Sequence, residues 1–121
     1  MKKILVVDDK KNVRISLGIG LRREGYQVDE ASDAIEAIMK MELTHYDVLL
    51  SDVKMPVISG IELANTVAKL YPGVKTILMS AYDFKEFEEL ESEVPKLSKP
   101  FEMIDLLNLL DNEPNPFEIV T

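Results

Sequence analysis

Cysteine is absent from this sequence of 121 residues. Its absence excludes disulfide bonds, thiolate nucleophiles and cysteine-based zinc sites, and it suits a reducing compartment, so we expect a cytoplasmic location. Long hydrophobic runs are absent as well, because the apolar stretch at residues 4–7 is far shorter than a signal peptide or a membrane span. Internal repeats and low-complexity tracts are also missing. We therefore expect one domain over residues 1–112, followed at 113–121 by a tail or the start of a linker.

Positive charge is in deficit, since 14 lysines and arginines face 22 acidic residues and the net charge is -8. A charge of this sign repels nucleic-acid phosphates and anionic membrane surfaces, so we expect no direct binding to either. Hydrophobic residues make up 46% and charged residues 30% of the chain, which excludes a disordered or fibrous protein.

Short apolar runs rich in branched residues alternate with helical patterns. The predicted strands cover residues 4–7, 28–31, 48–50 and 76–79. Their nearly continuous hydrophobicity is typical of strands covered on both faces, as in a parallel sheet. Capping boxes at Asp33–Glu36 and Ser59–Glu62 predict two helix starts, Gly25 follows the end of an earlier helix, and a closing helix is expected at 104–110. This alternation predicts right-handed βαβ units and a doubly wound α/β sheet.

Polar and charged side chains follow the predicted strands. Asp8 and Asp9 come after the first strand, Asp52 after the third, Ser80 after the fourth, and Lys99 shortly before the last helix. Because ligand sites in such sheets lie beyond the carboxyl ends of the strands, we expect these side chains to gather there. Closely packed carboxylates raise at least one pKa unless a cation compensates, which implies a bound metal. Oxygen ligands alone indicate Mg²⁺ or Mn²⁺.

A single acid after a strand has a plainer explanation, because such a residue often caps the next helix. Asp9 alone fits that role, with a helix beginning near Lys11. Acids, a hydroxyl and a lysine rarely follow successive strands by chance. The combination therefore favours a functional metal site over separate helix caps.

Four segments carry a resemblance to a known family: VVDD at 6–9, SDVKMPVISGIEL at 51–63, ILMSAY at 77–82 and SKPF at 98–101. From residue 4 to residue 110 the chain resembles the response-regulator receiver domains of two-component signalling systems. The resemblance implies a five-stranded parallel sheet in the flavodoxin-like order 2-1-3-4-5. It also implies phosphorelay signalling by a domain that is not an enzyme, since it catalyses only its own phosphorylation and dephosphorylation.

The resemblance assigns the phosphoryl chemistry to three residues. Asp52 would be the phospho-acceptor, with a sensor histidine kinase or a phosphotransfer protein as donor. Ser80 would hydrogen-bond the new phosphoryl group, and Lys99 would pair with its charge. The partners implied downstream are an output domain or protein and a second copy in a phosphorylation-dependent dimer.

The metal ligands are implied by the same resemblance. Asp9 would bind Mg²⁺ directly, Asp8 would help through water, and Asp52 would share the metal. Lys54 would lend its backbone carbonyl. In physical terms this is phosphoryl transfer by positioning and charge neutralisation.

The sequence departs from the family pattern between Ser80 and Lys99. Lys96 occupies the position where receivers commonly carry an aromatic switch residue, which leaves the route from phosphate to output face open. The stretch is also short, which predicts a shortened fourth helix, with residues 86–90 as a candidate. The family context further predicts a cis peptide bond at Lys99–Pro100, against the general trans preference.

Two other functions stay open at this point. A receiver-like interaction module that works without phosphorylation is favoured by the missing aromatic residue. A metal-dependent phosphatase that forms an aspartyl phosphate usually has a second acid two residues after the nucleophile. This chain has Lys54 there, which counts against the phosphatase.

Overall fold

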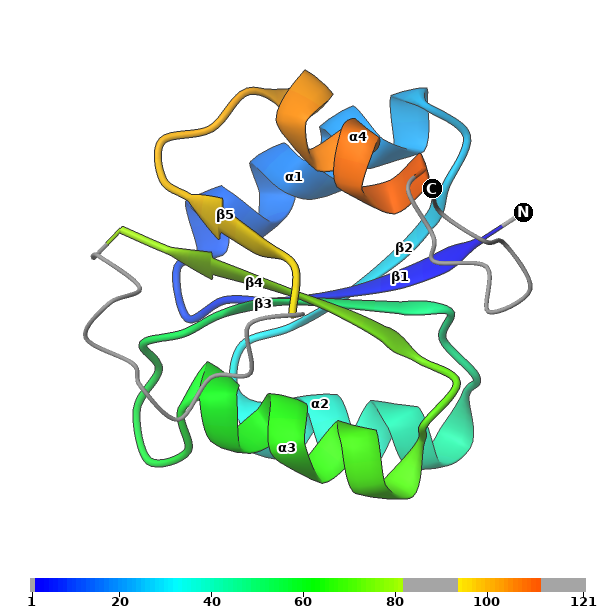
Figure 1. Ribbon diagram of the computed structural model, residues 1–121, viewed down its shortest axis with the longest axis vertical. Helices are drawn as coiled ribbons and strands as arrows, with labels where there is room; N and C mark the ends of the chain where they lie inside the picture. The colour runs from blue at the N-terminus through cyan, green and yellow to red at the C-terminus, as the bar shows by residue number, and fades with distance from the viewer. Residues whose placement is uncertain (1, 82–93, 112–121) are drawn as a thin grey trace, which may run out of the picture.

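Five parallel strands form one sheet with helices on both faces (Figure 1). The computed structural model describes residues 2–81 and 94–111. In that part of the chain the elements are β1 (Lys3–Val7), α1 (Lys11–Arg23), β2 (Gln27–Ala31), α2 (Ala34–Leu43), β3 (Val48–Asp52), α3 (Gly60–Leu70), β4 (Lys75–Ser80), β5 (Lys96–Ser98) and α4 (Met103–Asp111). The strand order is β2-β1-β3-β4-β5, and every neighbouring pair is parallel. The predicted doubly wound sheet is therefore confirmed.

Two predictions fall outside the described residues. The shortened fourth helix, with its candidate at 86–90, lies within residues 82–93, and the predicted tail lies within residues 112–121. Both stay predictions. Among residues 2–81 and 94–111, no helix is both long enough and apolar enough to cross a membrane.

The central strands are buried from both sides. Alternate side chains of a strand point to opposite faces of the sheet. Ile4 and Val6 of β1 pack into a core with α1 and α4, whereas Leu5 and Val7 pack into a second core with α2 and α3. Figure 1 shows the same division, with α1 and α4 covering one face and α2 and α3 the other. This two-sided burial explains the continuous hydrophobicity of the strands in the sequence.

The predicted helix boundaries are formed by local hydrogen bonds. Asp33 Oδ1 accepts the N–H of Glu36 at 2.8 Å, and Ser59 Oγ accepts the N–H of Glu62 at 3.1 Å. Gly25, just after α1, has a φ of 93°, in the left-handed region that favours glycine. Both predicted helix starts and the helix stop are therefore confirmed, although the carboxylate of Glu36 accepts from Ser32 rather than from the N-cap residue Asp33.

Two strands extend past their predicted C-terminal ends. The prediction ended β3 at residue 50 and β4 at residue 79, whereas the structure extends them to Asp52 and Ser80. The reason is that backbone pairing continues past the last apolar side chain, with Asp52 opposite Met79. Asp52 and Ser80 are consequently held by the sheet itself rather than by a loop.

Candidate functional site

The ends of β1 and β3 bring three carboxylates together. The strand register pairs Val7 with Ser51, which makes the next residues, Asp8 and Asp52, neighbours. One carboxylate oxygen from each of Asp8, Asp9 and Asp52 lies within 4.8 Å of the other two. Asp8 and Asp52 are buried and Asp9 is exposed, so the cluster is closed on one side and open to solvent on the other.

Lys99 reaches this cluster from the loop between β5 and α4. Its amine lies 2.9 Å from Asp8 Oδ2 and 3.4 Å from Asp52 Oδ1. Its backbone N–H donates to the carbonyl of Ser80 at 2.8 Å, which ties the loop to the end of β4. The peptide bond Lys99–Pro100 is cis, as predicted. The expected gathering of the acids and the lysine is therefore observed.

Burial and charge shift the ionisation of the cluster. Burial raises the pKa of the Asp52 carboxyl, Lys99 offsets part of the rise, and the nearby charge of Asp8 adds to it. Burial alone would lower the pKa of Lys99, but its contacts with Asp8 and Asp52 outweigh burial and raise it. Three negative charges and one positive charge leave -2 when all four groups are ionised. A divalent cation would neutralise that excess.

Asp8 is fixed by contacts that the sequence did not reveal. Its Oδ1 accepts the N–H of Lys10 at 2.9 Å. Its backbone carbonyl accepts a bond of 2.7 Å from Nη1 of Arg14, whose Nε lies 3.3 Å from Glu30 Oε1. Arg14 thus braces the end of β1 against β2. The signal for it was weak: one arginine near the start of the helix that follows the acid pair.

The plainer explanation of Asp9 as a helix cap is wrong. The N-cap residue of α1 is Lys10, and the side chain of Lys10 makes no capping hydrogen bond. The exposed carboxylate of Asp9 lies in the acidic cluster instead.

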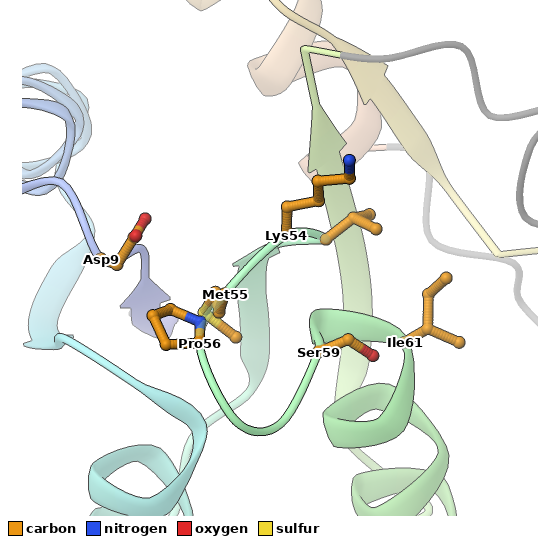
Figure 2. Close-up of a pocket in the computed structure, with 7 residues that line it drawn as sticks. Asp9, Lys54, Met55, Pro56, Ser59 and Ile61 are labelled. Atoms are coloured by element: carbon orange, nitrogen blue, oxygen red, sulfur yellow. The ribbon is translucent and has the colours of Figure 1, made fainter.

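The loop between β3 and α3 forms a pocket beside the cluster. Figure 2 shows Asp9, Lys54, Pro56 and Ser59 among the residues that line it. The loop returns closely to the strand, because the N–H of Gly60 donates to the carbonyl of Val53 at 2.8 Å. A Cβ atom at Gly60 would lie 1.9 Å from the carbonyl oxygen of Asp52, so only glycine fits. Sequence reasoning missed this requirement.

The remaining residues singled out in the sequence lie on β4, on β5 and in the loop after β3. Ser80 ends β4 and is buried, opposite Ser98 of β5. Lys54 follows β3 by two residues and lines the pocket beside Asp9. Lys96, at the position of the usual aromatic residue, lies on β5 and donates from its amine to the carbonyl of Val94 at 3.0 Å.

The comparison with known families decides the identity. Residues 4–111 match the response regulator receiver domain. The chain belongs to this family. As a receiver domain of two-component systems, it is a phosphorylation-dependent signalling domain and not an enzyme of the ordinary kind. The reading as a module that works without phosphorylation is not favoured.

Named relatives agree with this assignment. The receiver domain is 32% identical to the transcriptional regulatory protein PdtaR of Mycobacterium tuberculosis, a match that covers 99% of this chain and 60% of PdtaR. The chain thus spans about three fifths of that relative. It is 30% identical to the response regulator receiver protein CpdR of Brucella abortus, over 92% of this chain and 95% of CpdR.

A solved structure agrees as well. The response regulator protein TrrA of Thermotoga maritima, in complex with Mg²⁺-BeF, superposes with a TM-score of 0.84 at 35% identity. The superposition covers 92% of this chain and 97% of TrrA. The receiver fold is therefore shared over nearly the whole length of both chains.

Proposed function

We propose that Asp52 accepts a phosphoryl group in a Mg²⁺ site formed with Asp8 and Asp9. The observation that carries this proposal is the cluster itself: three carboxylates within 4.8 Å, two of them in contact with the amine of Lys99. The donor is a sensor histidine kinase or a phosphotransfer protein. Phosphorylation then switches the interaction with an output domain or protein.

The donor set fits a hard divalent cation. Carboxylate oxygens are preferred by Mg²⁺, which keeps several water ligands and so needs an open side, as Asp9 provides. The ligands would be Asp8, Asp9, Asp52 and the backbone carbonyl of Lys54; Mn²⁺ accepts the same donors. The Mg²⁺-BeF complex of TrrA supports the proposal by similarity. When bound, the ion would neutralise charge on the phosphoryl oxygens.

The protein's own residues supply the nucleophile and its surroundings. A carboxylate oxygen of Asp52 attacks phosphorus, an O–P bond forms, and the N–P bond of the donor histidine breaks. The imidazole leaves with the electron pair. The strand end holds Asp52 in place, which favours an in-line attack because a fixed nucleophile loses little further freedom.

Two further groups act on the product. Lys99, already 3.4 Å from Asp52 Oδ1, pairs with the negative charge of the acyl phosphate. The hydroxyl of Ser80, buried at the end of the neighbouring strand, donates a hydrogen bond to a phosphoryl oxygen. Attack of water on phosphorus later breaks the O–P bond to Asp52, releases inorganic phosphate and returns the free carboxylate.

The wider assignments are proposals as well. We place the receiver domain at residues 1–112, supported by the family match over residues 4–111, and a tail or linker at 113–121. The net charge of -8 supports the absence of direct nucleic-acid binding and of membrane attachment. A cytoplasmic location and a phosphorylation-dependent dimer complete the proposal.

Labelling by a small-molecule phosphodonor tests the acceptor. With acetyl phosphate and Mg²⁺, intact mass spectrometry should show one added phosphoryl group on the wild type and none on Asp52→Asn. The matched control is Asp47→Asn, since Asp47 lies at the opposite end of β3 and its amide can still accept the Lys3 N–H bond. Full labelling of Asp52→Asn would move the acceptor to another residue.

A further inference from the structure

Each polar group of Asp8 has a hydrogen-bond partner. Its carboxylate oxygens accept from the N–H of Lys10 and from the amine of Lys99. Its own N–H donates to the carbonyl of Ala31, the last residue of β2, at 3.2 Å. Its carbonyl accepts from Nη1 of Arg14 at 2.7 Å. Arg14 thus acts on Asp8 from outside the proposed metal site.

The carbonyl that Arg14 holds belongs to the peptide group between Asp8 and Asp9. A peptide group is planar, so restraining its oxygen also restrains the N–H and the Cα atom of Asp9. The side chain of Asp9 is exposed, so burial does not hold it in place. Asp8 and Asp9 are both ligands in the proposed Mg²⁺ site. The orientation of Arg14 therefore affects how these two carboxylates lie relative to each other.

Glu30 of β2 holds the guanidinium of Arg14 at a second point. Its Oε1 lies 3.3 Å from Nε of Arg14, whereas Nη1 of the same group donates to Asp8. Because the guanidinium is planar, contacts on two different nitrogens leave it little freedom to turn. The side chains of Arg14 and Glu30 are only 14% and 28% exposed, so salt and water screen this ion pair less than a surface pair.

Glu30 is itself anchored on both sides of its strand. In the sheet it lies opposite Val6 of β1, two residues before Asp8. Its backbone carbonyl accepts a hydrogen bond from the amine of Lys40 on α2. A carboxylate on an anchored backbone can orient its partner, because it does not move with it. Glu30 therefore offers Arg14 an acceptor at a fixed place.

We propose that Glu30 is a positioning residue for the phosphorylation site, acting through Arg14 on the peptide group that joins Asp8 and Asp9. The inference rests on the proposed function, because it concerns the same Mg²⁺ site. The hydrogen bond from Arg14 carries the effect, rather than the charge of Glu30. Removal of the acceptor lets the guanidinium turn, and the two ligands then bind Mg²⁺ more weakly.

Titration calorimetry with Mg²⁺ alone tests the role of Glu30. Glu30→Ala should raise the Kd by about threefold to tenfold and by no more than Arg14→Ala does, since it acts through that residue. Glu30→Gln keeps an oxygen acceptor and loses the charge, so its Kd should stay within about twofold of the wild type. Asp29→Ala is the matched control, because Asp29 precedes Glu30 in β2 and bonds Tyr46 instead of Arg14. Its Kd should equal that of the wild type.

A double variant shows whether Glu30 acts through Arg14. Arg14→Ala combined with Glu30→Ala should bind Mg²⁺ as Arg14→Ala alone does, because the two losses are coupled. Labelling by acetyl phosphate should be slower in Glu30→Ala at low Mg²⁺ and recover at saturating Mg²⁺. Additive losses in the double variant, or equal losses in Glu30→Gln and Glu30→Ala, would overturn the proposal in favour of a direct effect of charge.

The same titrations separate this inference from the proposed function. A wild type that binds no Mg²⁺ would contradict the proposed metal site and this inference with it. A wild type that binds Mg²⁺ with the same Kd as Glu30→Ala would overturn this inference alone.

Discussion

Lys99 and Asp8 form an ion pair of 2.9 Å, although 91 residues separate them in the sequence. The carboxylate of Asp8 is fully buried and the side chain of Lys99 nearly so. The amine thus supplies positive charge to the acidic cluster, and it links the last strand of the sheet to the first one in the chain. Replacing Lys99 should therefore change both the stability of the fold and the binding of a metal ion.

We expect Lys99→Met to lower the free energy of unfolding by roughly 3 kcal/mol in chelator, because a buried carboxylate loses its partner. Saturating Mg²⁺ should stabilise the variant more than the wild type, since the ion replaces the missing charge. Urea unfolding with and without Mg²⁺ measures both effects. Lys96→Met is the control, and similar losses in the two variants would contradict the role of Lys99.

Arg14 should influence the proposed metal site without contacting the metal. Arg14→Ala frees the carbonyl of Asp8, and the Kd for Mg²⁺ should rise about tenfold, the usual cost of losing a supporting contact. Arg22→Ala is the control, because Arg22 also lies on α1 and donates to a backbone carbonyl, that of Val28, away from the cluster. Titration calorimetry measures both values. Equal changes would mean that Arg14 has only a general structural role.

Gly60→Ala should destabilise the protein by roughly 3 kcal/mol, because its Cβ would collide with the backbone of Asp52 and the loop would have to shift. Gly73→Ala is the control, since nothing lies within 4 Å of its Cβ position. Chemical denaturation compares the two. A loss at Gly60 no larger than that at Gly73 would show that the close approach is easily relaxed.

Tyr46 and Asp29 give a pH-dependent contribution to stability. The buried Tyr46 hydroxyl donates to Asp29 Oδ2 at 2.6 Å, and this bond outweighs burial and lowers the pKa of Asp29. Because the pKa of Asp29 is lower in the folded protein than in the unfolded chain, its ionisation stabilises the fold at pH values above the unfolded pKa. This stabilisation is lost as the pH falls through the folded pKa. Tyr46→Phe should lower the free energy of unfolding by about 1.5 kcal/mol near pH 7. This lies at the low end of the range for hydrogen bonds to charged groups, because the side chain of Asp29 is 42% exposed.

The difference between Tyr46→Phe and the wild type should shrink between pH 7 and an acidic pH below the lowered folded pKa of Asp29, where Asp29 becomes protonated in both. Urea unfolding at the two pH values measures it. Tyr71→Phe is the control, since the hydroxyl that donates to Asp29 belongs to Tyr46 and not to Tyr71. A difference that stays constant with pH would mean that the hydroxyl stabilises the fold independently of the Asp29 charge.

Much of the fold could be predicted because the relevant signals are carried by side chains. The apolar runs of β1, β3 and β4 locate the sheet, and the capping residues Asp33 and Ser59 locate two helix starts. The carboxylate cluster could be predicted for the same reason, because its acidic side chains follow the strands directly in the sequence. The ends of β3 and β4 were placed too early because backbone pairing continues beneath polar side chains.

The missed residues have a common physical cause. Arg14 acts on the carbonyl of Asp8, and Gly60 is required by the carbonyl of Asp52. Both partners are backbone atoms, which look alike at every position of a sequence. Only the three-dimensional arrangement shows which carbonyl a distant side chain or glycine will meet.

The most direct test of the account is the Mg²⁺ dependence of phosphorylation at Asp52. The initial rate of labelling by acetyl phosphate should be negligible in chelator and rise with Mg²⁺ to a plateau. Its half-saturation should equal the Kd for Mg²⁺ measured by calorimetry on the unmodified protein, because the same carboxylates bind the ion and accept the phosphoryl group. Labelling of Asp52 at full rate in chelator would contradict the account.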